Sequence, residues 1–172
     1  MSFSSADIKE LRDKSGAGMM DCKKALDESN GDIEKAIEWL RKKGINTAQK
    51  KSTRSASDGL VTIHTSGNQA VMIEVNAETD FVARNEVFQT FCNELSETCI
   101  SNGCKDIDSL LNSKYINSDK NVQVVLTDII AKLGENIVIR RLKYIDESKF
   151  KFQKYLHNSI NEKSGKIGVL LI

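Results

Sequence analysis

The chain has 172 residues, a formal net charge of +1 and 40% hydrophobic residues, which is the composition of an ordinary globular protein of one domain with room for a small accessory unit. The balanced charge excludes a global field that would draw the protein to nucleic acid or to a membrane surface. No apolar run approaches the roughly 18 residues of a membrane span, and the first residues, MSFSSADIKEL, lack a signal sequence, which favours the cytoplasm.

The first 44 residues predict three short helices separated by glycine-containing breaks at residues 16–18 and 30–31. Asp32 is a candidate N-cap for the third helix, which carries apolar residues at helical spacing and is predicted to end at Gly44. None of these helices is long enough to be stable alone, so we expect them to pack together as a small bundle.

Residues 45–58, INTAQKKSTRSASD, are small, polar and basic, and they predict a flexible linker. Lys50, Lys51 and Arg54 in this segment are candidates for contacts with RNA phosphates. No aromatic residue lies among them, so a solvated linker is the simpler interpretation.

After the linker, the spacing of apolar residues predicts β-strands and helices in turn. LVTIHT at residues 60–65 and AVMIEV at residues 70–75 flank Ser-Gly-Asn and predict a hairpin. An apolar stripe at residues 87–99 predicts a buried helix, and a second helical pattern begins with Ser118 as its candidate cap. ENIVIRRLKYID at residues 135–146 alternates enough to predict a strand.

The C-terminal residues predict a second hairpin. KFQKYLH at residues 151–157 and KIGVLLI at residues 166–172 bracket a polar turn. The last strand is the most apolar one, and an uncapped edge of that kind attracts other chains. We therefore expect either that the chain is truncated here or that a second subunit pairs with this strand in a homodimer.

The corner between the first hairpin and the helix that follows, TDFVARN at residues 79–85, places a large apolar side chain beside a carboxylate. Thr79 is predicted to be an N-cap whose hydroxyl accepts from the backbone N–H of Phe81 or Val82, with Asp80 beside the positive end of the helix. Helix initiation does not explain Phe81. From the residues alone it is either core under the corner or a contact for a partner.

The sequence does not predict a set of catalytic side chains. The cysteines at positions 22, 92, 99 and 104 show no C-x-x-C spacing and lie far in sequence from both histidines, so we interpret them as reduced, mostly buried thiols. No catalytic triad, phosphate loop or metal-ligand set is present, and no catalytic residue, cofactor or metal is predicted. A cysteine enzyme stays open as an alternative, with one rapidly alkylated thiol as its signature.

Four stretches resemble the bacterial and organellar translation elongation factor Ts family, and they occur in that family's order and at about its spacing. They are KELRDKSGAGMMDCKKALDESNGDIEKAIEWLRKKG (9–44), TDFVARN (79–85), GENIVIRR (134–141) and KIGVLL (166–171). The resemblance implies an α+β protein with four parts. These are a three-helix module like the ubiquitin-associated fold (1–44), the basic linker (45–58), a core subdomain of antiparallel strands packed with helices (59–146), and the opening hairpin of a second related subdomain (147–172).

In that family the protein is a guanine-nucleotide exchange factor for elongation factor Tu, with no cofactor, nucleic acid or membrane required. The resemblance implies that Asp80 and Phe81 approach the GTPase near its magnesium site, with Phe81 inserted between two helices of the nucleotide domain. Thr79 and Val82 belong to the same contact.

The resemblance also implies contacts outside the corner. Arg12, Met19 and Met20 match residues of the small N-terminal module that contact another helix of the nucleotide domain, and His157 matches a position that faces the third domain of elongation factor Tu. From the residues alone, Met19 and Met20 are equally explained as part of the helical bundle.

Two further interpretations stay open. The N-terminal module is the functional part of a peptide- or ubiquitin-like-binding protein, or the basic linker belongs to an RNA-associated accessory protein of translation. In either case the short chain would lack exchange activity.

Overall fold

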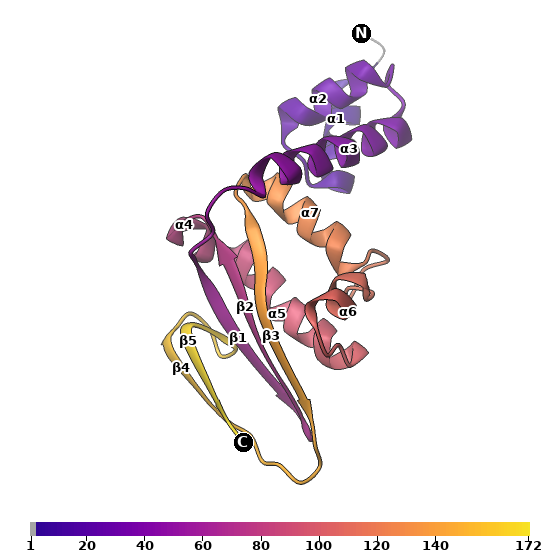
Figure 1. The fold of residues 1–172 in the computed structure, drawn as a ribbon. Coiled ribbons are helices and arrows are strands. Elements are labelled where there is room, and N and C mark those ends of the chain that lie inside the picture. The colour runs from indigo at the N-terminus through magenta and orange to yellow at the C-terminus, as the bar shows by residue number, and fades with distance from the viewer. Residues whose placement is uncertain (1–2) are drawn as a thin grey trace.

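The computed structural model describes residues 3–172, which form an N-terminal helical module and a core of helices packed on an antiparallel sheet (Figure 1). The α+β class predicted from the sequence is confirmed. The module comprises α1 (Ser5–Ser15), α2 (Met19–Glu28) and α3 (Ile33–Lys51). The core comprises β1 (Asp58–Ser66), β2 (Gln69–Ala77), α4 (Asp80–Ala83), α5 (Glu86–Asn102), α6 (Ile107–Asn112), α7 (Val122–Leu133), β3 (Ile137–Asp146), β4 (Gln153–Ser159) and β5 (Ser164–Leu171).

The three helices of the module pack around their own small apolar core, as the spacing predicts. Leu11, Cys22, Ala25, Leu26 and Ala36 are fully buried there, and other apolar side chains pack around them. The predicted cap of the third helix is confirmed, because the Asp32 side chain accepts a hydrogen bond from the backbone N–H three residues later.

The third helix is longer than predicted, because it continues past Gly44 to Lys51. Glycine inside a helix is about 1 kcal/mol less favourable than alanine, but Gly44 lies against α7, where an added Cβ would be 3.6 Å from Ala131 Cβ. One turn later, Ala48 packs against the core cluster. These contacts stabilise the extra turns, so the linker predicted for residues 45–58 is helical in its first half.

The five strands form one antiparallel sheet in the order β3-β2-β1-β5-β4. β1 and β2 form the first predicted hairpin, in which Leu60 lies opposite Val75 and Ile63 opposite Met72. β2 pairs on its other side with β3, with a bulge between Glu74 and Val75. The strand predicted at residues 135–146 is therefore confirmed as one edge of the sheet.

Helices α5, α6 and α7 cover one face of the sheet (Figure 1). The largest fully buried side chains of this layer are Phe88 and Phe91, both on the stripe predicted for α5. The helix predicted to begin at Ser118 begins instead at Val122, because the side chain of Asn121 accepts from the backbone N–H of Val124 and caps it. None of the helices in residues 3–172 has the length and apolar character needed to cross a membrane.

The second predicted hairpin is confirmed as β4 and β5, and the last strand lies inside the sheet, although only its first two residues pair with β1. β5 lies between β4 and β1, and it meets β1 where Thr62 pairs with Ser164 and Val61 with Gly165. The two hydroxyls of Thr62 and Ser164 are buried and lie 2.9 Å apart, which ties the hairpin to β1. The hairpin therefore belongs to the same sheet as the first, and β4 is the edge strand.

Candidate functional site

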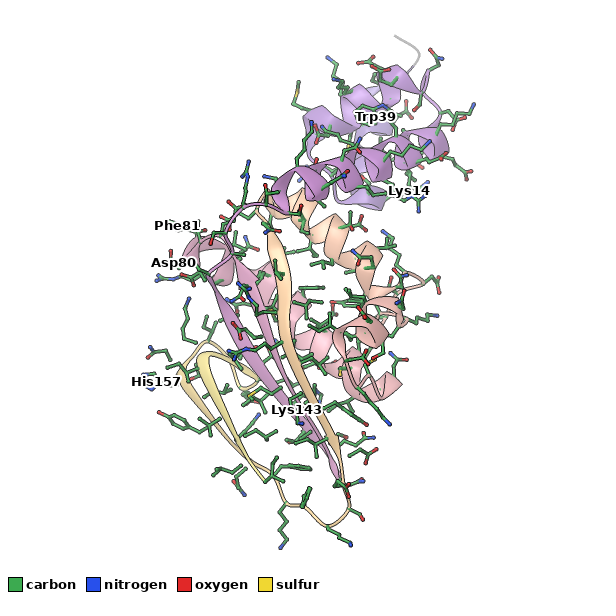
Figure 2. The ribbon with its side chains drawn as sticks, in the orientation of Figure 1. Lys14, Trp39, Asp80, Phe81, Lys143 and His157 are labelled. Carbon is green, nitrogen blue, oxygen red and sulfur yellow. The ribbon has the colours of Figure 1, made fainter. Side chains whose placement is uncertain are left out.

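The corner after β2 holds one apolar side chain out of the protein. α4 is a single turn in which Phe81 is 80% exposed, whereas Val82 and Ala83 pack in the core. Figure 2 shows Asp80 and Phe81 projecting from α4 away from the body of the core. Of the two interpretations of Phe81, core packing is therefore wrong, since the turn is anchored by the residues that follow it.

Val82 has a different place from the one that the resemblance implies. Its side chain is 8% exposed and belongs to the core cluster, so it faces inward when Phe81 faces out. On a single helical turn, consecutive side chains point about 100° apart, so Val82 and Phe81 point in different directions. In this structure the Val82 side chain anchors α4 to the core.

Thr79 is the N-cap of α4, but the predicted hydrogen bond within the turn is absent. Its hydroxyl instead donates to Glu135 Oε1 at 2.6 Å, and its backbone N–H donates to Glu135 Oε2 at 3.0 Å. A carboxylate accepts both bonds more strongly than a neutral acceptor would. The hydroxyl is thus used to fix the corner to the start of β3.

A second carboxylate, this time on the corner itself, also joins the corner to the start of β3. Glu78, beside Thr79, accepts from the backbone N–H of Asn136 at 2.6 Å. Glu78 also lies 3.6 Å from the guanidinium of Arg54, whose carbonyl accepts from the Asn136 side chain at 2.8 Å. We call Glu78, Thr79, Glu135 and Asn136 the corner clamp. Through Arg54 it also holds the segment between α3 and β1.

The sequence prediction missed the corner clamp. Glu135 precedes β3 and Glu78 directly follows β2, and no residue near either glutamate marks a partner more than fifty positions away. The stretch GENIVIRR at residues 134–141, one of those that resemble the family, was the available signal for Glu135. The resemblance alone implied no role for that glutamate.

Asp80 lies at the exposed end of the corner, where its carboxylate pairs with the guanidinium of Arg84 at 2.9 Å. The Arg84 side chain is 72% exposed and that of Asp80 is 41% exposed, and ion pairs at the surface contribute little to stability. The carboxylate can therefore exchange Arg84 for another cation at small cost.

The N-terminal module presents a second apolar surface. Met19 and Met20 begin α2 directly after its N-cap Gly18, and they are 59% and 75% exposed. Arg12, near the end of α1, is exposed as well. The interpretation of the two methionines as part of the bundle is wrong, because the bundle is filled by residues such as Leu11 and Leu26.

His157 is exposed on β4, where its Nδ1 lies 3.0 Å from the hydroxyl of Tyr155. Figure 2 shows His157 and Phe81 projecting on the side of the core that faces away from α6 and α7. The predicted residues thus occupy three separate surfaces: the corner, the start of α2 and the second hairpin. They do not line one cavity.

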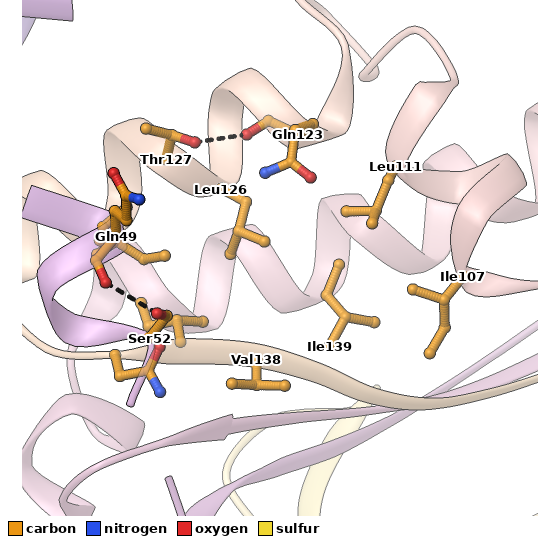
Figure 3. Close-up of a pocket in the computed structure, with 13 residues that line it drawn as sticks. Gln49, Ser52, Ile107, Leu111, Gln123, Leu126, Thr127, Val138 and Ile139 are labelled. Atoms are coloured by element: carbon orange, nitrogen blue, oxygen red, sulfur yellow. Dashed lines mark hydrogen bonds between the residues drawn. The ribbon is translucent and has the colours of Figure 1, made fainter. Parts of the chain in front are cut away.

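A groove lies elsewhere, between the end of α3, the helices α6 and α7, and β3 (Figure 3). It has a volume of about 440 Å³, and none of the residues that line it carries an ionisable side chain. Apolar residues such as Leu111, Leu126 and Ile139 form its walls, with Gln49 and Gln123 beside them. The hydroxyls of Ser52 and Thr127 donate to the backbone carbonyls of Gln49 and Gln123, and no acid or base lines the groove to activate them.

The cysteines do not form a reactive site. All four are buried. Burial raises the pKa of the Cys92 thiol, and burial together with the neighbouring Cys104 raises the pKa of Cys99 to about 12. Within residues 3–172, no three His, Cys, Asp or Glu side chains are placed to share a metal ion. The geometry thus speaks against the cysteine-enzyme alternative.

Comparison with known proteins identifies the family. A family model described as Elongation factor TS matches residues 78–172, more than half of the chain. The chain belongs to the elongation factor Ts family. Elongation factor Ts of Methylorubrum extorquens (strain PA1) is 48% identical over 164 residues, 95% of this chain and 53% of that protein. The same factor from Magnetococcus marinus is 47% identical, and that from Bartonella henselae 46%, each over 99% of this chain and 55% of the relative.

The chain spans about half the length of these curated elongation factor Ts relatives. The family match begins at Glu78, so it includes the whole corner clamp, Phe81 and His157. The similarity to the full relatives also extends over the N-terminal module.

Proposed function

We propose that this chain promotes guanine-nucleotide exchange on elongation factor Tu and makes or breaks no covalent bond in doing so. One observation carries the proposal: Phe81 is 80% exposed on a turn whose next residues are buried. An apolar ring that the fold holds in water, beside a carboxylate, is typical of a contact that is completed by a partner.

An exchange factor acts by binding the nucleotide-free GTPase more tightly than the nucleotide-bound one. Burial of an aromatic ring contributes about 1.5 to 3 kcal/mol, which matches a typical coupling energy of about 1 to 3 kcal/mol between two ligands. Insertion of Phe81 between helices of the GTPase therefore supplies a large share of the free energy needed to displace GDP.

Asp80 supplies the complementary electrostatic effect. A GTPase holds the phosphates of its nucleotide partly through a bound magnesium ion. The Asp80 carboxylate is held only by the exposed Arg84, so it is available to disturb the ligands of that ion when Phe81 enters. The corner clamp fixes the segment from which both side chains project.

The N-terminal module adds a second contact on the nucleotide domain through Arg12, Met19 and Met20. Methionine side chains adapt to irregular apolar surfaces, and Arg12 supplies a flexible cation beside them. His157 is proposed as a third contact, with the third domain of elongation factor Tu. These assignments rest on the resemblance together with the exposure of all four side chains.

Release of a fluorescent GDP analogue from elongation factor Tu, followed by stopped flow, tests the proposal. The chain should accelerate release, and Phe81→Ala should reduce the acceleration by about tenfold or more, since it removes about 1.5 kcal/mol or more of burial. Phe150→Ala is the matched control, because Phe150 is also an exposed aromatic residue but lies between β3 and β4. It should leave the rate unchanged.

Two outcomes would contradict the proposal in different ways. Equal acceleration by the Phe81→Ala variant would reject the role of Phe81. No acceleration by the unchanged chain at any concentration would reject exchange activity, and a binding assay with nucleotide-free elongation factor Tu then shows whether the contact itself forms.

The structure favours this function over the two alternatives. An RNA contact through the basic segment has few free cations, because Lys51 donates to the carbonyl of Gly134 and Arg54 pairs with Glu78. A separate peptide-binding role for the module predicts that it acts without the core, yet its third helix also packs on α7. Salt-sensitive RNA binding, or activity of the isolated module, would revive these alternatives.

A further inference from the structure

The turn between β4 and β5, residues 160–163, is fastened to the rest of the core by one residue. Lys163 donates from Nζ to Glu97 Oε1 of α5 at 2.5 Å, and its carbonyl accepts from the backbone N–H of Ile63 at 2.8 Å. Within the described chain, residues 3–172, no other residue of this turn forms a hydrogen bond or ion pair with α5 or β1. The position of the turn therefore depends strongly on the pairing of Lys163 with Glu97.

His64 lies on β1 with one ring nitrogen left without a partner. Its Nδ1 is buried and forms no hydrogen bond with any residue that the structure describes. Three charged side chains act on the ring, each from a different segment: Glu97 from α5, Lys163 from the turn and Lys154 from β4. Val71, which lies opposite His64 on β2, carries no charge. The imidazole and the ion pair of the turn thus share one partly buried environment.

The observed arrangement suits a neutral His64. Burial, followed by the positive charge of Lys163, lowers the pKa of His64 below 6.5, and Glu97 opposes them. A neutral ring leaves Glu97 paired with Lys163. Protonation changes this balance, because both nitrogens of an imidazolium donate hydrogen bonds, and its charge repels Lys163 and attracts Glu97.

We propose that protonation of His64 moves Glu97 from Lys163 to the imidazolium and so releases the turn between β4 and β5 from α5. One carboxylate then has two alternative cations, and the pH decides which of them it holds. The two cations differ in their access to water. The Lys163 side chain is 33% exposed, so its ammonium can be solvated after release, whereas the buried Nδ1 of a charged His64 requires an acceptor.

The released turn belongs to the hairpin that carries His157. Acidification should therefore loosen this hairpin locally, before the fold as a whole is lost. The proposal concerns this chain alone and does not rest on the exchange function.

Amide hydrogen exchange measured by NMR, with rates corrected for their intrinsic dependence on pH, tests the proposal. The N–H of Ile63 is the reporter, because it donates to the carbonyl of Lys163 and becomes exchangeable when the turn leaves. Its protection factor should fall by about fivefold or more between neutral pH and a pH at which His64 is protonated, the effect of losing one charge-assisted hydrogen bond. The protection factor of Val75, on β2 between β1 and β3, should fall less.

Three variants separate the partners of the switch. His64→Gln keeps a polar side chain that does not titrate, and it should remove the pH response at Ile63. Glu97→Gln should lower the pKa of His64, read from the chemical shift of its ring proton, because it removes an anion. Lys163→Met should raise that pKa, because it removes a like charge. A purely structural role of these two residues would not move the pKa in opposite directions.

Lys120→Met is the matched control. It removes the ion pair of another lysine, with Asp128 of α7, which lies apart from the hairpin (Figure 1). It should leave both the protection of Ile63 and the pKa of His64 unchanged.

Equal protection of Ile63 at the two pH values would overturn the proposal. A fall of the same size in the His64→Gln variant would also overturn it, since another group would then control the turn. Equal falls at Ile63 and Val75 would show that the whole sheet opens, which contradicts a local release. If the pKa of His64 is the same in the Glu97→Gln and Lys163→Met variants, the exchange of partners is rejected as well.

Discussion

Thr79 and Glu135 lie 56 positions apart in the chain and are joined by two hydrogen bonds to the two oxygens of one carboxylate. This relationship fixes the corner from which Phe81 projects to Glu135, two residues before β3. The direction of the exposed ring therefore depends on a side chain from a distant segment of the sequence.

Glu135→Gln tests this dependence. The amide keeps the shape of the carboxylate but retains only one acceptor oxygen, so one of the two bonds from Thr79 is lost. We expect the free energy of unfolding to fall by about 1 to 3 kcal/mol, the cost of an unmade hydrogen bond to a charged group. Urea denaturation measures this loss, and nucleotide release should slow even where the variant is fully folded.

The control for Glu135→Gln is Glu10→Gln, which removes an exposed ion pair with Lys14 on α1. It should change the stability by less than about 0.5 kcal/mol. Equal stability of the Glu135→Gln variant and the unchanged chain would show that the corner does not need the clamp.

Phe81 and Phe88 make a matched pair of aromatic residues with opposite surroundings. Phe81 is 80% exposed, whereas Phe88 is fully buried in the core. Phe81→Ala should change the free energy of unfolding by less than about 0.5 kcal/mol, and Phe88→Ala should lower it by about 3 to 5 kcal/mol. A large loss of stability in the Phe81→Ala variant would place that ring in the core.

Substitutions at Gly44 should raise or lower the stability of the protein according to the size of the new side chain. Its missing Cβ has room at 3.6 Å from Ala131, so Gly44→Ala should stabilise the protein by up to about 1 kcal/mol through helix propensity. Gly44→Leu should instead force α3 away from α7 and lower the stability by about 1 to 3 kcal/mol. Thermal unfolding compares the three chains, and a stabilising leucine would show that the contact with α7 is loose.

His64 gives the fold a dependence on pH. Its Nδ1 is buried without a hydrogen-bond partner. Burial and then the charge of Lys163 lower its pKa below 6.5; Glu97 opposes them, and Lys154 adds the smallest effect. The unfolded chain therefore binds the proton more readily, and the contribution of neutral His64 to stability is complete above pH 6.5 and is lost as the pH falls through the folded pKa.

We expect the melting temperature to fall as the pH is lowered from 6.5, and His64→Phe should reduce that fall. His157→Gln is the control and should keep it, because His64 remains. Asp58, whose pKa is lowered chiefly by its hydrogen bond with Lys166, loses its contribution in a separate range below pH 3.8. An unchanged pH profile in the His64→Phe variant would assign the effect to other groups.

Much of the fold could be predicted because its signals are local. Apolar residues at helical spacing and a Ser-Gly-Asn turn are visible within a few residues, and they gave α5 and the first hairpin correctly. The end of α3 could not be predicted in this way. Its last turns are stabilised by contacts with α7, about 80 positions later, and a small polar segment looks like a linker when those contacts are unknown.

In the candidate site, too, local features could be predicted from the sequence and contacts between distant residues could not. The sequence places Phe81 beside a carboxylate at a corner, but only the structure distinguishes an exposed ring from a buried one. The hydroxyl of Thr79 had two possible uses, and the local one, capping, was predicted. The structure uses it for Glu135, because a nearby carboxylate is a stronger acceptor.

The unbroken course of α3 has a consequence for how the protein meets a large partner. A helix of 19 residues is a stiff rod, about 28 Å long at 1.5 Å per residue, and here its two ends are packed into different units. The methionines of α2 and the ring of Phe81 are therefore carried at a set separation, with little rotational freedom left to lose on binding. Once one patch has bound the partner, the second patch is already at high local concentration near its own site. Either patch can then dissociate while the other remains bound.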